Sequence, residues 1–149
     1  MAIVLRVVSV CVLSYRRKGK VAYGDDRWWC VSGKKVPMQE NVILGFAGKN
    51  GADIGKEELM TAEGVFDFQE YIKKELKAGK DVSGLAKELW ERNPEVILVS
   101  QEVGYGVVPM DAFDRKYREA VGRVCTSLAA KSRKVTRVVC GIGMVIKNA

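Results

Sequence analysis

The chain has 149 residues, of which 48% are hydrophobic, which suits one folded domain with a sizeable core and argues against disorder. The formal net charge is +7, and the chain contains no histidine. Residues 1–50 hold nine Lys/Arg against three Asp/Glu, a net +6, whereas residues 51–149 hold sixteen against fifteen, a net +1. The positive excess therefore lies near the amino end, where it would attract nucleotide phosphates or nucleic acid.

Cysteine usage and hydropathy indicate a cytoplasmic protein that does not enter a membrane. The four cysteines are scattered, without a C-x-x-C pair or any histidine to complete a zinc site: Cys11, Cys30, Cys125 and Cys140. Two of them lie in apolar, strand-like runs, which favours buried, reduced thiols. Residues 1–13 are apolar but too short to span a bilayer, and Arg6 interrupts them. A signal peptide is the weaker alternative for this stretch.

The first predicted strand, residues 3–13, is followed by the basic segment SYRRKGKVAY at residues 14–23. A phosphate-binding loop of the type G-x-x-x-x-G-K-[ST] needs glycines for backbone N–H groups, a lysine for the terminal phosphates and a hydroxyl for magnesium. Only Gly19 and Lys20 fit this pattern, and Val21 stands where the hydroxyl is needed. The segment is either a degraded phosphate loop or a basic surface turn.

Residues 24–57 carry two weaker signals. Trp28 and Trp29, beside Arg27, could stack on bases as in single-strand binders, although such a pair more often caps a small core or a subunit contact. A second glycine-rich segment, residues 48–57, follows the strand-like residues 42–44. Its glycine spacing is one residue short of the phosphate-loop pattern and Glu57 replaces the hydroxyl, so we expect a flexible loop there.

Two helices are expected next, at residues 56–78 and 82–92, separated by a break at residues 79–81. The first has an apolar stripe formed by Val65, Phe68, Ile72 and Leu76. The second buries Leu85 and Leu89. Neither helix presents a catalytic constellation, so both are interpreted as packing elements.

Residues 96–99 (VILV) form a continuous apolar run, typical of a strand covered on both faces. This strand delivers Ser100, Gln101 and Glu102 to its carboxyl end. Gly104 and Gly106 then allow the backbone to turn or to approach a ligand closely.

A long helix is expected after Pro109, with Asp111 or Asp114 favourable at its positive end. One face forms an apolar stripe, whose members are Phe113, Tyr117, Val121, Val124 and Leu128. The other face carries Arg115, Arg118, Glu119 and Arg123. This charged face is either simply solvated or, because it starts just after a glycine-rich loop at a strand end, part of a phosphate site.

Strands at residues 135–140 and 144–146, joined by a loop at 141–143, complete the predicted elements. Strands that alternate with helices through short loops predict an α/β fold with a three-layer, mostly parallel sheet. Open sheets of this kind bind ligands outside the carboxyl ends of their strands. The candidate ligand site is therefore the edge at residues 100–106.

Four motifs follow one another over about residues 95–147: "EVG" at residues 102–104, "GVVP" at 106–109, an "R-x-aromatic-R" helix start with a later Gly-Arg, and a last strand running into "GI-hydrophobic-K". In these motifs the carboxyl-terminal part of the chain resembles the adenosylcobinamide kinase/adenosylcobinamide-phosphate guanylyltransferase family of cobalamin biosynthesis. The third motif comprises Arg115, Tyr117, Arg118, Gly122 and Arg123, and the fourth comprises Gly141, Ile142 and Lys147.

The resemblance implies a single adenosylcobinamide kinase-like domain over residues 1–149, with a sheet of the P-loop NTPase (RecA-like) type. It implies a kinase that uses Mg²⁺ with GTP or ATP, a corrinoid as the second small-molecule partner, and a homo-oligomer. The expected catalytic residues are Lys20, Glu102 and Arg118, with Glu102 as the metal ligand. The expected nucleotide-binding residues are Gly19, Lys20, Gly104, Arg115 and Arg118.

Two departures from the family pattern bear on activity. The family transfers a guanylyl group through a covalently modified histidine, and this chain has none, which closes that route. The family also has a middle strand ending in an acidic residue near the phosphates, and we find no such segment before residue 96.

Three hypotheses follow. The first is a divergent kinase of this family, and the second is a non-catalytic relative that binds a nucleotide or corrinoid, or only assembles with itself. The third, less expected, is a small basic nucleic-acid binder using residues 6–35, whose affinity would fall steeply with salt.

Overall fold

The computed structural model describes residues 10–14, 48–103, 108–139 and 142–148, called the described residues below. They form six strands and four helices. In chain order these are β1 (Val10–Ser14), β2 (Gly48–Asn50), α1 (Lys56–Leu59), β3 (Gly64–Phe66), α2 (Phe68–Lys77), α3 (Leu85–Arg92), β4 (Ile97–Gln101), α4 (Ala112–Lys131), β5 (Lys134–Val139) and β6 (Ile142–Asn148).

All six strands belong to one sheet with the order β2-β3-β4-β1-β5-β6. β2, β3 and β4 pair in parallel, whereas β1 runs antiparallel to both of its neighbours, and β6 runs antiparallel to β5. The α/β class is therefore confirmed, and the parallel arrangement holds for β2, β3 and β4 within a sheet that is mixed as a whole. The RecA-like type and the three layers stay predictions.

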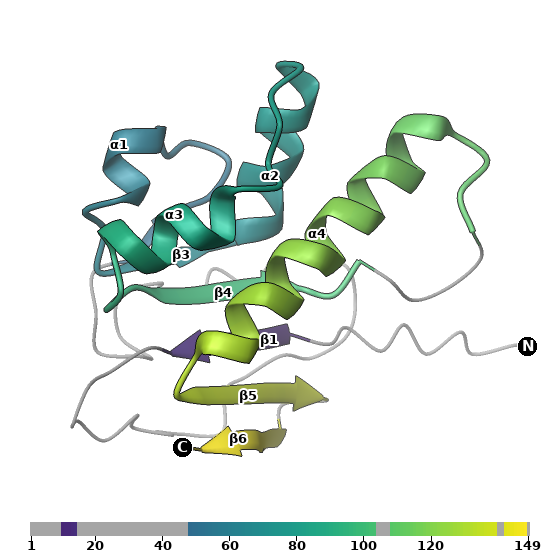
Figure 1. The fold of residues 1–149 in the computed structure, drawn as a ribbon. Coiled ribbons are helices and arrows are strands. Elements are labelled where there is room, and N and C mark those ends of the chain that lie inside the picture. Colours follow the sequence, from purple (N-terminus) through teal and green to yellow (C-terminus); the bar gives the residue numbers. More distant parts are fainter. Residues whose placement is uncertain (1–9, 15–47, 104–107, 140–141, 149) are drawn as a thin grey trace, which may run out of the picture.

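The helices are stacked against the sheet with α3 and α4 crossing the same face (Figure 1). The connection β3–α2–α3–β4 returns the chain to a neighbouring parallel strand, which is the usual use of a helical crossover. α4 then carries the chain past β4 and β1 to β5, which points the same way as β4 because both are antiparallel to β1.

The single helix expected at residues 56–78 is wrong. The chain instead forms α1, the short strand β3 and α2. Phe68, Ile72 and Leu76 do lie on the buried face of α2, but Val65 belongs to β3, where it is fully buried between two parallel neighbours. A three-residue strand is too short to reveal a period of two, so its apolar residues merge with the stripe of the following helix.

The flexible loop expected at residues 48–57 is also wrong. Here the chain forms β2, a tight turn and the start of α1. The turn packs closely on the end of β3: Gly51 donates its backbone N–H to the Phe66 carbonyl at 2.7 Å, and a Cβ at Gly51 would lie 2.3 Å from the Asp67 carbonyl oxygen. Glycine is required here by contact with a neighbouring strand, which the local sequence does not reveal.

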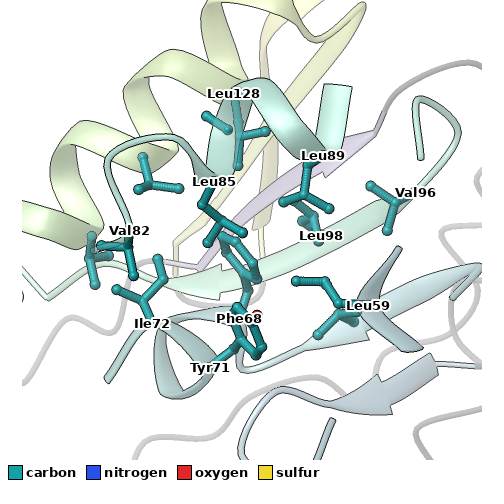
Figure 2. Packing of buried hydrophobic residues seen from close by; sticks show 14 of the residues in the cluster. Leu59, Phe68, Tyr71, Ile72, Val82, Leu85, Leu89, Val96, Leu98 and Leu128 are labelled. Carbon is teal, nitrogen blue, oxygen red and sulfur yellow. The ribbon is translucent and has the colours of Figure 1, made fainter. Parts of the chain in front are cut away.

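The core lies between the helices and the sheet (Figure 2). Leu85 and Leu89 of α3 are buried as predicted, and they meet Leu98 of β4 and Leu128 of α4. The Phe68 and Tyr71 rings of α2 lie nearly parallel, with centroids 6.2 Å apart. The apolar stripe predicted for α4 is confirmed, with Tyr117, Val121, Val124 and Leu128 buried and Phe113 partly buried.

β4 does not have both faces buried equally, as its apolar run had indicated. Leu98 and Ser100 are buried against the helices, whereas Ile97, Val99 and Gln101 are only half-buried. Strand β4 also ends two residues later than predicted, at Gln101, which brings Ser100 into the sheet. This placement sets the geometry of the site below.

Both ends of α4 are capped by side chains. Asp111 accepts a hydrogen bond from the backbone N–H of Asp114 at 3.0 Å, as the sequence had predicted for the helix start. At the other end, Lys147 of β6 donates to the carbonyl oxygens of Ala129 and Ala130 at 3.1 and 2.7 Å. Lys147, the lysine of the fourth family-like motif, therefore satisfies carbonyl oxygens at the end of α4 that have no partner within the helix.

None of the helices in the described ranges is long and apolar enough to cross a membrane.

Candidate ligand site at the carboxyl ends of the parallel strands

The three parallel strands end at the same level of the sheet. Their register pairs Asn50 with Phe66, and Val65 with Leu98, so that Gly51, Asp67 and Ser100 come to one edge. Ligands of open α/β sheets bind at this kind of edge, because the loops that follow the strands converge there.

Asp67 follows β3 directly and has a left-handed backbone conformation, with φ of +50°. It is the single described non-glycine residue with a positive φ. Its Oδ1 accepts hydrogen bonds from the side-chain amides of Gln69 and Gln101, at 3.0 and 3.1 Å. Such backbone strain is kept where surrounding contacts determine it, often at functional sites.

Gln69 links Asp67 to the end of β4. Its Oε1 accepts from the backbone N–H of Gln101 at 2.9 Å and from the Ser100 hydroxyl at 3.4 Å. Gln69 and Ser100 are buried, with 3% and 2% of their surfaces exposed. Asp67, Gln69, Ser100 and Gln101 therefore form a connected carboxyl-end network, in which buried polar groups hold the half-buried Asp67 carboxylate in place.

Glu102, the predicted catalytic and metal-binding acid, lies immediately after β4. It forms an ion pair with Arg137 of β5, with 3.5 Å between Nη2 and Oε2. Arg137 reaches Glu102 across β1, which lies between β4 and β5. Both side chains are about one-third exposed, so the pair keeps access to solvent and to ligands.

The arginines of α4 have different environments. Arg115 turns back to the loop before the helix and donates to the carbonyl oxygens of Pro109 and Met110. Arg123 is exposed and pairs with Glu119 at 2.6 Å. Arg118 is half-buried, next to Tyr117 on the side of α4 that leads to Cys125. Of the three, Arg118 is the one that is partly buried, whereas the Arg115 guanidinium is exposed and bonds the carbonyl oxygens of the preceding loop.

Tyr117 and Cys125 bring α4 into contact with this edge. The Cys125 thiol is half-buried and lies 3.9 Å from the Ser100 hydroxyl. Tyr117 is 6% exposed, and the Lys73 ammonium of α2 lies over its ring, 5.4 Å from the centroid. Burial raises the pKa of Tyr117, and the Glu70 carboxylate raises it further, so that the phenol keeps its proton.

Gly19, Lys20 and Gly104, which complete the sequence-based site, lie outside the described residues, as do Trp28 and Trp29. The structure thus brings Glu102 to the same sheet edge as the network, places Arg118 on the adjacent helix, and directs Arg115 away to a loop. The assigned roles of all six residues stay predictions.

The expectation that no middle strand ends in an acidic residue is wrong. β3 is such a strand, and Asp67 follows it at the same edge as Glu102. Gln69 and Arg137 also belong to this edge without having been predicted from the sequence. The available signal was Asp67 after the apolar pair Val65-Phe66, but it was hidden by assigning these residues to a helix.

These carboxylates suit the way Mg²⁺ binds beside phosphates. Within the described ranges no group of three or more His, Cys, Asp or Glu side chains converges as a metal cage. Magnesium in phosphoryl-transfer sites is usually held by one or two carboxylates, with phosphate oxygens and water completing its shell. Asp67, with Oδ2 outside its two amide contacts, and the solvent-accessible Glu102 fit that donor set.

The fold and this edge define an α/β protein with a polar site at the carboxyl ends of its parallel strands. Comparison with known families then identifies it further. The family described as cobinamide kinase / cobinamide phosphate guanyltransferase matches residues 57–146, which run from α1 to β6 and make up more than half of the chain. The chain belongs to this family, as the resemblance predicted.

Curated relatives match a shorter part. The bifunctional adenosylcobalamin biosynthesis protein CobU of Escherichia coli is 47% identical over 53 residues, which are 36% of this chain and 29% of the relative. The protein of the same name from Salmonella typhimurium matches equally well. CobP of Pseudomonas aeruginosa, another bifunctional adenosylcobalamin biosynthesis protein, is 37% identical over 60 residues, 40% of this chain and 35% of the relative. The matches thus span about a third of the relatives' length.

Proposed function

We propose that the protein is a nucleotide-dependent transferase of the cobalamin-biosynthesis type, which phosphorylates the hydroxyl of a cobinamide with GTP or ATP and Mg²⁺. The observation that carries this proposal is Asp67, an acidic residue held by a buried network just after β3, at the same sheet edge as Glu102, which follows β4. Family membership supports the same reaction class. The relatives are named for adenosylcobalamin biosynthesis.

Phosphoryl transfer depends mostly on positioning and on neutralising charge. In the proposed site, Asp67 and Glu102 would hold Mg²⁺, which would neutralise charge on the phosphate oxygens. Gln69 and Gln101 keep Asp67 oriented, and Arg137 shares Glu102 with the metal or its waters. Gly19 and Lys20 are proposed to contact the terminal phosphates, with Gly104, Arg115 and Arg118 as further nucleotide contacts.

The proposal covers the kinase reaction alone. Guanylyl transfer through a modified histidine needs a histidine, and the whole chain contains none. The four scattered cysteines, without a C-x-x-C pair, support a reducing, cytoplasmic compartment.

A second candidate is a non-catalytic relative that binds nucleotide or corrinoid, or that assembles with itself. The observation favouring it is the reduced phosphate-loop pattern, in which only Gly19 and Lys20 match. The apolar side chains of Met144, Val145 and Ile146 on β6 are more than half exposed, which supports self-association.

Calorimetric titration of the full chain with GTP, ATP and cobinamide, with and without Mg²⁺ and at two salt concentrations, tests the binding part. Mass spectrometry of cobinamide incubated with GTP or ATP tests transfer. The kinase proposal expects Mg²⁺-dependent nucleotide binding and a phosphorylated cobinamide. Binding without any product would favour the second candidate, and binding of neither nucleotide nor cobinamide would remove the first.

A matched pair of variants separates the site from general charge effects. Glu102→Gln removes the carboxylate at the carboxyl end of β4, and Glu95→Gln removes an exposed carboxylate that precedes the same strand. The proposal expects weaker Mg²⁺-dependent binding in the first variant and wild-type binding in the second. Equal binding in both would exclude Glu102 from the site.

A further inference from the structure

The Tyr117 hydroxyl is a buried hydrogen-bonding group without a partner among the described residues. Tyr117 is 6% exposed, and its hydroxyl oxygen is the one buried side-chain N or O atom of the described residues that lacks a partner. A donor left in this state costs free energy, because it loses water without gaining an acceptor. Such groups in native proteins call for a specific explanation.

Lys73 is a second donor at the same place. Its ammonium lies over the Tyr117 ring, 5.4 Å from the centroid, and no carbonyl or carboxylate of the described residues accepts a hydrogen bond from it. The side chain is half-buried, and its flexible stem allows the ammonium to leave the ring. A half-buried ammonium and a buried hydroxyl that has no partner among the described residues therefore meet at one ring between α2 and α4.

A second lysine–tyrosine pair in α2 shows what a satisfied arrangement looks like. Lys74 also lies 5.4 Å from a buried tyrosine ring, that of Tyr71, but its ammonium donates to the carbonyl oxygens of Ala52 and Ile54 at 3.0 and 2.5 Å. The Tyr71 hydroxyl is absent from the buried, unpartnered atoms of the described residues. Among the described residues, the hydroxyl that is both buried and unpartnered is therefore that of Tyr117 and not that of Tyr71.

The surroundings of the pair connect it to the carboxyl-end network. Tyr117 lies just over two helical turns before Cys125, whose thiol contacts Ser100. The carboxylates of Glu70 and Asp67 are close enough to act on the phenol. These carboxylates repel an anionic ligand. The positive charge of the Lys73 ammonium has to offset that repulsion, and the Tyr117 hydroxyl adds a hydrogen bond to the ligand.

We propose that Tyr117 and Lys73 form a phosphoryl-binding subsite, in which the tyrosine hydroxyl and the lysine ammonium donate to the same phosphoryl group of a bound ligand. An anionic oxygen supplies an acceptor that neither group finds among the described residues, and charge-assisted bonds of this kind are the strong ones. Lys73 leaves the ring and turns its ammonium toward the phosphoryl oxygens. The subsite deepens the proposed nucleotide-dependent function, on which it rests.

The test measures the dissociation constants of inorganic pyrophosphate and of GTP with Mg²⁺ by calorimetry on the full chain. Tyr117→Phe removes only the hydroxyl and should weaken binding of both probes by about 10- to 100-fold. Its melting temperature without ligand should stay the same or rise, because the unpartnered group is gone. Lys73→Met keeps the stem and should weaken binding as well. Tyr71→Phe is the matched control and should bind like the wild type.

The outcomes separate this subsite from the wider function. Wild-type protein that binds pyrophosphate through Tyr117 but never phosphorylates cobinamide would leave the subsite intact and overturn the kinase proposal. Unchanged pyrophosphate and GTP binding in Tyr117→Phe would overturn the subsite alone. An equal loss in Tyr71→Phe would also overturn it, because the effect would then be general to buried tyrosines. Wild-type protein that binds neither probe would overturn the subsite and the nucleotide proposal together.

Discussion

The side-chain amide of Gln101 donates a hydrogen bond to Asp67 Oδ1 at 3.1 Å, and this bond joins the carboxyl ends of β4 and β3. The two residues are 34 positions apart in the chain. Their contact aligns an acidic side chain with the end of the neighbouring strand, next to Glu102. The site proposed here depends on this alignment.

Asp67→Asn should separate the charge of Asp67 from its structural role. Asparagine tolerates the left-handed backbone and keeps an oxygen that accepts from Gln69 and Gln101, so the melting temperature should change little. Mg²⁺-dependent nucleotide binding should weaken by about tenfold or more, because a carboxylate ligand is lost. Thermal unfolding and calorimetry measure the two effects. Asp67→Asn protein that binds nucleotide as well as wild type would argue against a metal-binding role.

Gly51→Ala should destabilise the protein, because the added Cβ would lie 2.3 Å from the Asp67 carbonyl oxygen. Overpacking of this kind costs about 1–3 kcal/mol in the free energy of unfolding, measurable by urea denaturation. Gly122→Ala is the opposite case: this glycine lies inside α4 with nothing within 4 Å of an added Cβ. It should stabilise the helix by about 0.5–1 kcal/mol. A change in the free energy of unfolding of the same sign in both variants would contradict this explanation.

Gly122→Ala also tests a motif residue. If Gly122 is kept only as part of α4, nucleotide binding should be unchanged while stability rises. A loss of binding in a more stable protein would mean that a ligand or a partner approaches the helix at this glycine.

Lys147→Met should lower stability without changing ligand binding. The lysine ammonium satisfies two carbonyl oxygens at the end of α4, and the loss of these bonds should cost about 0.5–2 kcal/mol. Urea denaturation measures the cost, with the exposed Lys116→Met as control. Weakened nucleotide binding with unchanged stability would instead give Lys147 a direct role in the site.

Acid should weaken the contact between α1 and α3. The Arg92 guanidinium bonds Glu57 at 2.6 Å and lowers the pKa of that carboxyl, and a hydrogen bond from Lys56 likewise lowers the pKa of Glu88. A lowered folded-state pKa contributes stability above the usual value of 4.5, and this contribution is lost as the pH falls through the folded-state pKa. Arg92→Gln should therefore reduce the melting temperature at pH 7 more than below pH 4.5.

The control for this prediction is Lys87→Gln, which removes an exposed pair with Glu91 whose charged atoms are 3.9 Å apart. An exposed contact of this kind contributes little to the free energy of unfolding, so the melting curve of Lys87→Gln should follow that of the wild type at both pH values. An Arg92→Gln effect that does not shrink on acidification would mean that the arginine acts through packing rather than through its carboxylate partners.

The elements best predicted from the sequence are those with long, regular patterns. The apolar stripe of α4 and its Asp111 cap were recognised because a 20-residue helix repeats its pattern many times. β3 was missed because a strand of three residues cannot show a pattern at all. The error also removed Asp67 from consideration, although it follows β3 directly.

For the site, Glu102 was predicted near a strand end because the apolar run before it is continuous. Its partner Arg137 could not be predicted, because the two residues meet only after β1 has been placed between β4 and β5. The buried Gln69 gave no signal either. A glutamine on a helix is usually exposed, and this one is buried because it bonds the end of a neighbouring strand.

The sequence by itself determined the family, the excess of positive charge at the amino end, the long helix α4 and the lack of a histidine for guanylyl transfer. Only the tertiary structure decided that Asp67 directly follows a parallel strand, that Gln69 and Gln101 hold it, and that the Tyr117 hydroxyl is buried without a partner among the described residues. The physical reason is that local patterns record which side chains avoid water, whereas contacts between residues far apart in the chain depend on strand pairing and helix packing.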